Sequence, residues 1–201
     1  MARTKAFDEA GALSQAMELF WRCGYEATSV RDLTGRLGIS SSSLYTTFGD
    51  KREVFLSSLS RYRQIELEQV RELLESPLPV LSVLAHMFAQ LIDQLLADED
   101  RRGSFTLNAA VELGGRDAEV AAQLREHYED IAELLTRRLA GGQQMNEITT
   151  RHPADELARF ILNSMYSLGG VAKMIPDRNN MESIANLTLS VLESGEIALS
   201  G

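Results

Sequence analysis

The chain has 201 residues, of which 44% are hydrophobic and 24% are charged, and these proportions exclude a disordered or collagen-like protein. Its single cysteine, Cys23, excludes an internal disulfide and leaves too few thiols for a zinc finger. We find no apolar run near the ~18 residues that cross a bilayer. The N-terminus lacks the apolar segment of a signal peptide. We therefore expect a cytoplasmic protein with no membrane partner.

The formal net charge of −9 is unevenly distributed along the chain. Residues 1–63 carry nine Lys and Arg against seven Asp and Glu, a net charge of +2, whereas the remaining 138 residues carry −11. A weakly basic N-terminal third on an acidic body suggests local contact with an anion, with the body held away from it.

Apolar residues recur with helical spacing almost everywhere, and no stretch alternates with the period of a strand. In the N-terminal part the pattern predicts helices over 8–22, 30–37 and 51–75. Between the last two it predicts a short helix of about one and a half to two turns, capped by Ser40 and carrying Leu44, Tyr45 and Phe48. Beyond the prolines that follow the fourth helix, it predicts helices over 79–97, 104–113, 117–140, 153–174 and 181–192. The chain is therefore predicted to be all-α, with about nine helices.

The second and third predicted helices are short and are joined at Gly38, which suits a helix-turn-helix unit. Leu33 and Leu44 can fill the wedge between them, and Ser29 and Ser40 can cap their N-termini. The hydroxyl side chains left exposed on the second short helix would allow a close approach to the major groove of DNA. These side chains are Ser41, Ser42, Thr46 and Thr47, with Ser43 near the edge.

The stretch from Phe7 to Tyr62 resembles the DNA-binding domain of the TetR family of bacterial transcriptional regulators. The resemblance rests on five groups in order: Gly24-Tyr25 with Thr28-Ser29, Asp32-Leu33, Gly38-Ile39-Ser40, Ser43-Leu44-Tyr45 and Phe48-Gly49-Asp50-Lys51. Further along, the helix count, the string RRGSFTLNAAVELG and a glycine-terminated helix at 141 loosely resemble the acridine-regulator-like branch. The resemblance implies a helix-turn-helix domain at 1–50, a linking helix at 51–75, and an effector-binding and dimerisation domain at 76–201.

The family's roles transfer to matching residues as follows. Thr28 and Ser29 would bind phosphate at a helix N-terminus, and Tyr45 and Lys51 would contact further phosphates. Ser41, Ser42, Ser43, Thr46 and Thr47 would lie at the major groove, where Arg31 could also reach a guanine edge. Arg3 and Lys5 would form a basic arm.

Each DNA-binding role has a purely structural alternative. Ser29 and Ser40 can serve as caps alone, and Tyr45 can be a core aromatic residue. Arg31 can instead pair with Glu26 or Asp32. The N-terminal cations can equally be without function.

By resemblance, the acidic body would hold a small organic effector and form a homodimer. The candidate interface lies on the last two helices, at Phe160, Asn163, Ser164, Ser167, Leu168, Val171, Leu187 and Val191. The candidate effector residues are Met87, Phe88, Phe105, Asn108, Glu112, His127, Tyr128, Met165 and Tyr166. Both sets could instead be ordinary core. A pocket with one acid among aromatic residues would favour a neutral or cationic effector.

Catalytic and metal-binding patterns are missing from the sequence. His86, His127 and His152 lie far apart, and no nucleophile, base and acid are suitably spaced. We therefore expect no enzyme activity, cofactor or metal. The predicted function is a repressor that binds a palindromic operator in double-stranded DNA as a homodimer and is released by an effector. The alternatives are a regulator without an effector or with a protein partner, and an all-α enzyme or carrier.

Overall fold

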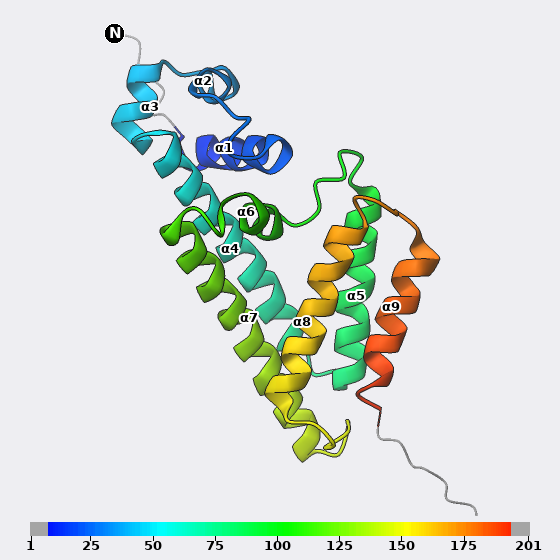
Figure 1. Cartoon of the computed structure of the whole chain (residues 1–201). Coiled ribbons are helices and arrows are strands. Elements are labelled where there is room, and N and C mark those ends of the chain that lie inside the picture. The colour runs from blue at the N-terminus through cyan, green and yellow to red at the C-terminus, as the bar shows by residue number, and fades with distance from the viewer. Residues whose placement is uncertain (1–7, 194–201) are drawn as a thin grey trace, which may run out of the picture.

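The computed structural model describes residues 8–193 and confirms the all-α prediction. Within that range it has nine helices and no strand (Figure 1). The helices are α1 (Glu9–Cys23), α2 (Val30–Leu37), α3 (Ser41–Phe48), α4 (Lys51–Leu74), α5 (Val80–Ala97), α6 (Phe105–Leu113), α7 (Ala118–Gln144), α8 (Ala154–Val171) and α9 (Arg178–Ser190). Arg3 and Lys5 lie outside the described residues.

The N-terminal helices begin and end where local chemistry requires. Ser29 and Asp32 form a reciprocal capping box at the start of α2, and Asp50 caps α4 in the same way. Gly38 ends α2 with φ 66°, a left-handed conformation that glycine adopts without steric cost. These short-range interactions fix where α2 begins and ends and where α4 begins.

The N-terminal cluster, our name for the hydrophobic core around Phe55, extends beyond the three-helix unit. Phe55 of α4 meets the rings of Phe20 and Phe105 edge to face, with centroids 5.1 and 5.8 Å apart. Leu113 and Val120 complete the same core, so α6 and the start of α7 pack with the helix-turn-helix unit.

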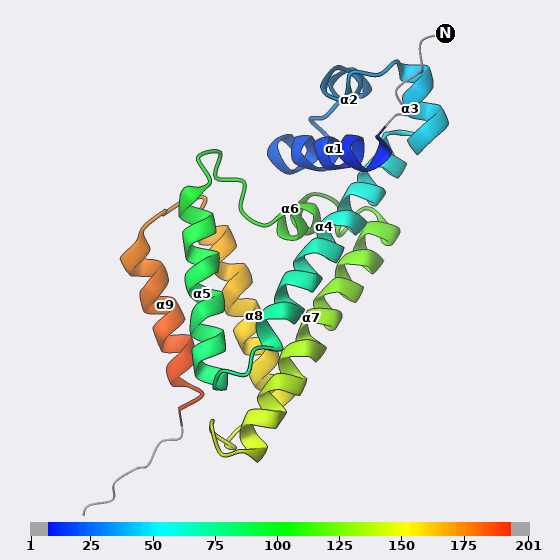
Figure 2. The ribbon, with the colours of Figure 1, turned by 180° about the vertical axis from the view of Figure 1, so that it is seen from behind.

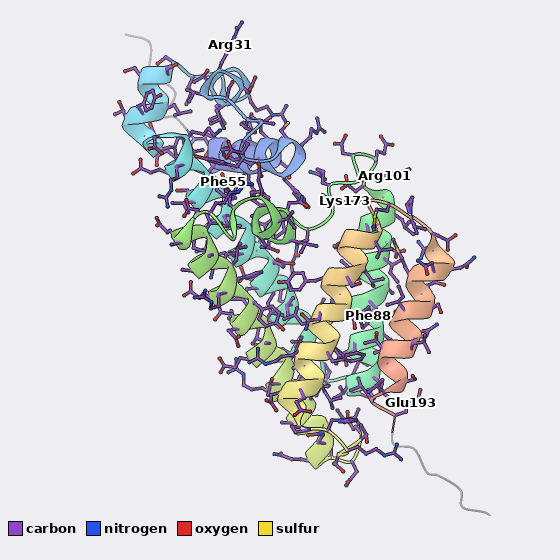
Figure 3. The ribbon with its side chains drawn as sticks, viewed as in Figure 1. Arg31, Phe55, Phe88, Arg101, Lys173 and Glu193 are labelled. Carbon is purple, nitrogen blue, oxygen red and sulfur yellow. The ribbon has the colours of Figure 1, made fainter. Side chains whose placement is uncertain are left out.

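The body cluster is a second core, formed mainly by α5, α7, α8 and α9, with Phe88 between the helices (Figure 3). Helix α5 has 18 residues and a mean hydropathy of 1.5, so it meets the length and composition test for a membrane span. We did not identify this apolar run from the sequence. Seven of its side chains, Phe88 among them, are buried in this core, as in the central helix of a soluble bundle.

Helix α7 continues to Gln144, four residues past its predicted end, because Gly141 and Gly142 do not terminate it. A Cβ atom at Gly142 would lie 2.5 Å from Cγ2 of Val80, so the glycine permits close contact with the first turn of α5. Gly142 thus serves interhelical packing, and neither glycine of the pair breaks the helix.

Helices α4 and α7 lie side by side in both views and connect the two clusters (Figures 1 and 2). At the N-terminal end of this pair, Arg52 makes a bidentate ion pair with Asp117, the residue that caps α7. The long helix that carries the helix-turn-helix unit is therefore fixed directly to the body.

Candidate nucleic-acid interface and effector cavity

The helix-turn-helix unit buries its apolar side chains and exposes its hydroxyl groups. Leu33 and Leu44 are fully buried between α1, α2 and α3. The predicted groove-facing residues Ser41, Ser42, Ser43 and Thr46 are exposed, and Thr47 is half-buried. The α3 surface is thus an uncharged row of short polar side chains that can approach base edges closely.

At the N-terminus of α2, the two predicted phosphate ligands differ. Thr28 is 1% exposed and its hydroxyl donates to the carbonyl of Gly24, so its side chain does not fit the predicted phosphate contact. Ser29 is exposed, but its hydroxyl and backbone N–H both donate to the Asp32 carboxylate, which lowers the pKa of that carboxyl group. Ser29 therefore caps the N-terminus of α2.

The other predicted DNA contacts lie on accessible surface. Tyr45 is half exposed, and the ammonium group of Lys51 lies 4.2 Å from the ring centroid of Tyr25. Within the described residues Arg31 makes no ion pair, and its side chain points away from the molecule (Figure 3). Arg31 thus forms no ion pair with Glu26 or Asp32, and its positive charge contributes to the lowered pKa of the Asp32 carboxyl group only after the hydrogen bonds from Ser29.

A cavity of about 610 Å³ lies where the helix-turn-helix unit meets the body. Its lining comes from α1, α4, α5, α7 and α8 and from the loop that joins α5 to α6. The volume falls in the range of small-molecule sites. Because Trp21 belongs to α1, a molecule in the cavity would touch the DNA-binding unit directly.

Three of the nine predicted effector residues line this cavity: Met87, Met165 and Tyr166. The other six do not: Phe88, Phe105, Asn108, Glu112, His127 and Tyr128. The phenylalanines fill the two hydrophobic clusters, and the polar residues have partners elsewhere.

The partners of Asn108 and Glu112 explain polar residues on an otherwise apolar helix. Asn108 donates to the carbonyl of Arg102 and accepts from Lys173. Glu112 accepts from the backbone N–H groups of Tyr25 and Glu26, so it holds the loop after α1. Both residues stabilise the junction between α6 and its neighbours.

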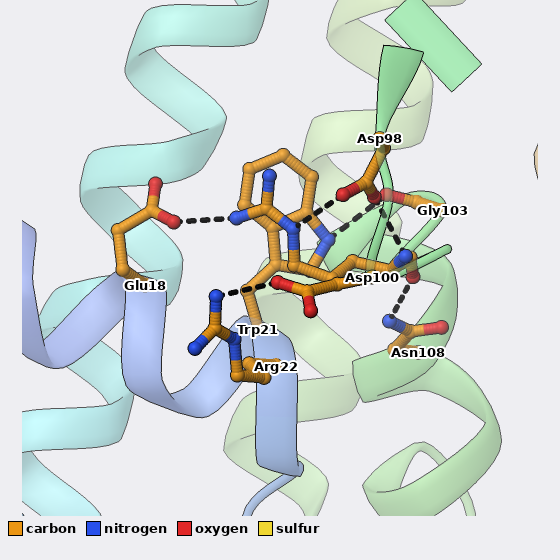
Figure 4. Close-up of polar contacts among 8 residues, drawn as sticks. Glu18, Trp21, Arg22, Asp98, Asp100, Gly103 and Asn108 are labelled. Carbon is orange, nitrogen blue, oxygen red and sulfur yellow. Dashed lines mark hydrogen bonds and ion pairs between the residues drawn. The ribbon is translucent and has the colours of Figure 1, made fainter. Parts of the chain in front are cut away.

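A group of contacts at one end of the cavity, here called the Arg102 clamp, ties the α5–α6 loop to α1 (Figure 4). The Arg102 guanidinium binds Glu18 at 2.5 Å and Asp98 at 3.1 Å, and lies 4.3 Å from the ring centroid of Trp21. The indole N–H of Trp21 donates to the carbonyl of Gly103 at 2.9 Å. A second ion pair, between Arg22 and Asp100, lies beside the clamp.

Glu66 of α4 contributes another carboxylate to the cavity wall. Its Oε2 atom lies 2.8 Å from Nε2 of His127, which is 1% exposed. Burial, with the negative charge of Glu66, raises the pKa values of Tyr62 and Tyr166, so both phenols remain neutral at physiological pH. Among the described residues, no group of three or more His, Cys, Asp and Glu side chains could hold a metal ion.

Sequence reasoning missed Glu66, Trp21 and Arg102 as cavity residues. Helical spacing places Glu66 on α4 but does not reveal which helix covers that face. For Arg102 the only signal in the sequence was its position just before the helix predicted over 104–113.

The predicted dimer residues divide between surface and core. Phe160, Leu187 and Val191 are exposed apolar side chains, Asn163 and Ser167 are exposed, and Ser164 and Val171 are half-buried. Leu168 is 0% exposed and packs in the body cluster, so its predicted place at an interface is wrong.

The protein thus has a helix-turn-helix unit with an exposed, hydroxyl-bearing second helix, joined to a helical body. This is the architecture of DNA-binding transcriptional regulators. Residues 12–57 match the family model described as "Bacterial regulatory proteins, tetR family", and residues 80–187 match "Tetracyclin repressor-like, C-terminal domain". The chain belongs to the TetR family.

Relatives cover nearly the whole chain. The "Uncharacterized HTH-type transcriptional regulator YezE" of Bacillus subtilis (strain 168) is 31% identical over 96% of this chain and 100% of its own. The "HTH-type transcriptional repressor ComR" of Escherichia coli (strain K12) is 29% identical over 93% of this chain and 90% of its own.

A solved structure of a cysteine mutant of the TetR family regulator CifR, complexed with 26bp double-strand operator DNA, is similar throughout. It matches with a TM-score of 0.82 and 27% identity, and covers 95% of this chain and 100% of that chain. The structure of reduced E. coli NemR matches with a TM-score of 0.83 and 15% identity over 92% and 98% of the two chains, which shows a common fold.

Proposed function

We propose that this protein is a cytoplasmic repressor that binds a palindromic operator as a homodimer and is released when a small organic effector occupies the cavity. The main observation behind this proposal is the row of exposed hydroxyl side chains on α3. The helix-turn-helix unit that holds these side chains also forms one wall of the cavity. The similar CifR structure bound to operator DNA supports the same mode of binding.

Dimerisation supplies what one recognition helix lacks. A single helix reads a half-site, and two helices about 34 Å apart occupy successive major grooves. Phe160 on α8, Leu187 on α9 and Val191 just after α9 are exposed apolar side chains. Burying them against a second copy of the chain would be favourable. Their mutual burial would relate the two half-sites by two-fold symmetry.

Effector control would act through the position of the helix-turn-helix unit. Tyr62 and Glu66 of α4 and Trp21 of α1 line the cavity, and both helices pack in the N-terminal cluster. A molecule that displaces these side chains would change the separation of the two recognition helices. The expected coupling free energy between the two sites is about 1–3 kcal/mol.

Selection of binding sites from a random duplex pool at ~150 mM salt tests the DNA-binding part. We expect an inverted repeat with half-sites one helical turn apart. Retention of all sequences alike, weakening steeply with salt, would contradict the proposal of a specific operator.

Replacement of Lys51 by alanine tests the predicted phosphate contact. We expect weaker binding to every duplex and a salt slope smaller by about one. The matched control is Arg137→Ala, which removes an exposed cation near the far end of α7. An unchanged slope in Lys51→Ala would remove this residue from the interface.

A further inference from the structure

We infer that the effector cavity takes an organic cation, whose positive charge pairs with the Glu66 carboxylate and whose apolar body lies against the aromatic rings. This inference rests on the proposed function and specifies the chemical class of its effector. It follows from the charges in the cavity wall, the hydrogen bonding of Glu66 and the rings beside it.

The charged residues of the wall are three carboxylates and one guanidinium group. The guanidinium, from Arg102, already binds the carboxylates of Glu18 and Asp98. An anionic ligand would have to break these ion pairs to reach a cation in the wall. Three negative charges against one positive charge leave two in the wall, and Glu66 is the carboxylate that has no guanidinium partner.

The contacts of Glu66 leave one of its carboxylate oxygens without a partner. Oε2 lies within hydrogen-bond distance of Nε2 of His127, and Oε1 has no hydrogen-bond partner among the described residues. Nδ1 of His127 is buried without a partner. His127 therefore reaches the carboxylate through Nε2 alone.

Aromatic rings lie in the same wall as this carboxylate. Tyr62, Tyr166 and Trp21 all line the cavity, and Met87 and Met165 add polarisable side chains. The face of an aromatic ring attracts a cation, as Arg102 shows against Trp21. The negative charge of Glu66 acts at both tyrosines, where it adds to the effect of burial on their pKa values.

Ligand charge then decides which molecules bind. A neutral molecule that fills the cavity removes water from Glu66 and leaves the free oxygen of a carboxylate without a counter-charge of its own, which is unfavourable. A cation removes the same water but supplies the opposite charge within reach of Oε1. Among molecules of one shape, the cavity should therefore select the positively charged one.

Three probes of nearly equal shape test this selection: N-methyl-para-phenylpyridinium, para-phenylbenzyl alcohol and para-phenylbenzoate. Calorimetry with the full chain should show that the pyridinium binds at least about tenfold more tightly than the other two. Glu66→Gln retains a group that can hydrogen-bond His127, and it should abolish most of that preference. Glu68→Gln is the matched control, because Glu68 is exposed on the same helix and lies outside the cavity wall.

Measurements on the unaltered protein decide the inference even if Glu66→Gln does not fold. Equal or tighter binding of the alcohol or the benzoate, or no saturable binding of the pyridinium, would overturn it. An equal loss of the preference in Glu68→Gln would also overturn it, since Glu66 would then have no special role.

Displacement of the selected operator duplex, followed by fluorescence anisotropy, separates this inference from the proposed function. Release of DNA by the benzoate alone would leave a ligand-responsive repressor but overturn the cation inference. Tight pyridinium binding that depends on Glu66 but releases no DNA would support the cation site and contradict effector control.

Discussion

Replacement of Arg102 by alanine should loosen the junction between the α5–α6 loop and α1. The guanidinium contacts Glu18, Asp98 and the ring of Trp21, which come from both sides of that junction. An alanine would leave the two carboxylates without their cation and expose one face of the indole. The Trp21–Gly103 hydrogen bond would then be the main direct contact left in the clamp.

The expected loss in the free energy of unfolding follows from these contacts. Asp98 is 14% exposed, so its charged hydrogen bond to Arg102 falls in the stronger class of about 1.5–3 kcal/mol. Glu18 is 45% exposed and contributes about 0.2–1 kcal/mol, and the contact with Trp21 adds about 0.5–1 kcal/mol. Because the backbone N–H of residue 102 still binds Asp98, we expect a total of about 2 kcal/mol.

The protein's single tryptophan lies in the clamp, so its fluorescence reports locally while far-UV circular dichroism reports the whole helical fold. In urea, Arg102→Ala should shift both transitions to lower concentration and move the fluorescence transition ahead of the dichroism transition. The control is Arg101→Ala, which removes an exposed neighbouring arginine. Equal losses in the two variants, with coincident transitions, would refute a stabilising role for the clamp.

Three further variants test the connection between α7 and its neighbours. Gly142→Ala should destabilise the fold by about 1–3 kcal/mol, because the new Cβ would clash with Val80. Gly141→Ala has open space around its Cβ and should stabilise the fold by about 0.5–1 kcal/mol. Similar melting temperatures for the two variants would contradict this packing argument. Arg52 holds the pKa of Asp117 at about 2, below its usual 3.8, so this contribution to stability is complete above the usual value and is lost as pH falls through about 2. Asp117→Asn should therefore be less stable than the unaltered protein at neutral pH and approach it toward pH 2, and a constant difference across that range would contradict the assignment.

The helix-turn-helix unit could be predicted closely because its determinants are local. Ser29, Gly38 and Asp50 act on residues within a turn of themselves, and the observed caps are at these positions. For this reason the predicted bounds of α2 agree with the structure, and α3 begins directly after the predicted cap Ser40.

The cavity was predicted poorly because it depends on contacts between distant segments. Periodicity identified the buried face of α5, but it did not show that α1 and α4 would form the opposite wall. Asn108 and Glu112 lie half-buried on an otherwise apolar helix, where polar groups need partners. Their partners are a loop carbonyl, Lys173 and the backbone after α1, none of which is close in sequence.

The end of α7 also depends on a contact between distant segments and not on neighbouring residues alone. A glycine pair is a reasonable helix terminator when only neighbouring residues are considered. At Gly142 the deciding contact is with Val80, 62 positions earlier in the chain.

The composition of the N-terminal cluster limits how the protein can be divided or recombined. The family match for the DNA-binding part ends at residue 57, but Phe105, Leu113 and Val120 complete the core beneath it. A chimaera that joins this N-terminal segment to another regulator's body would lack those side chains unless α6 and the first turn of α7 were transferred as well. Exchange of operator specificity between relatives should therefore succeed by grafting residues on the surface of α3, and fail when whole N-terminal segments are swapped.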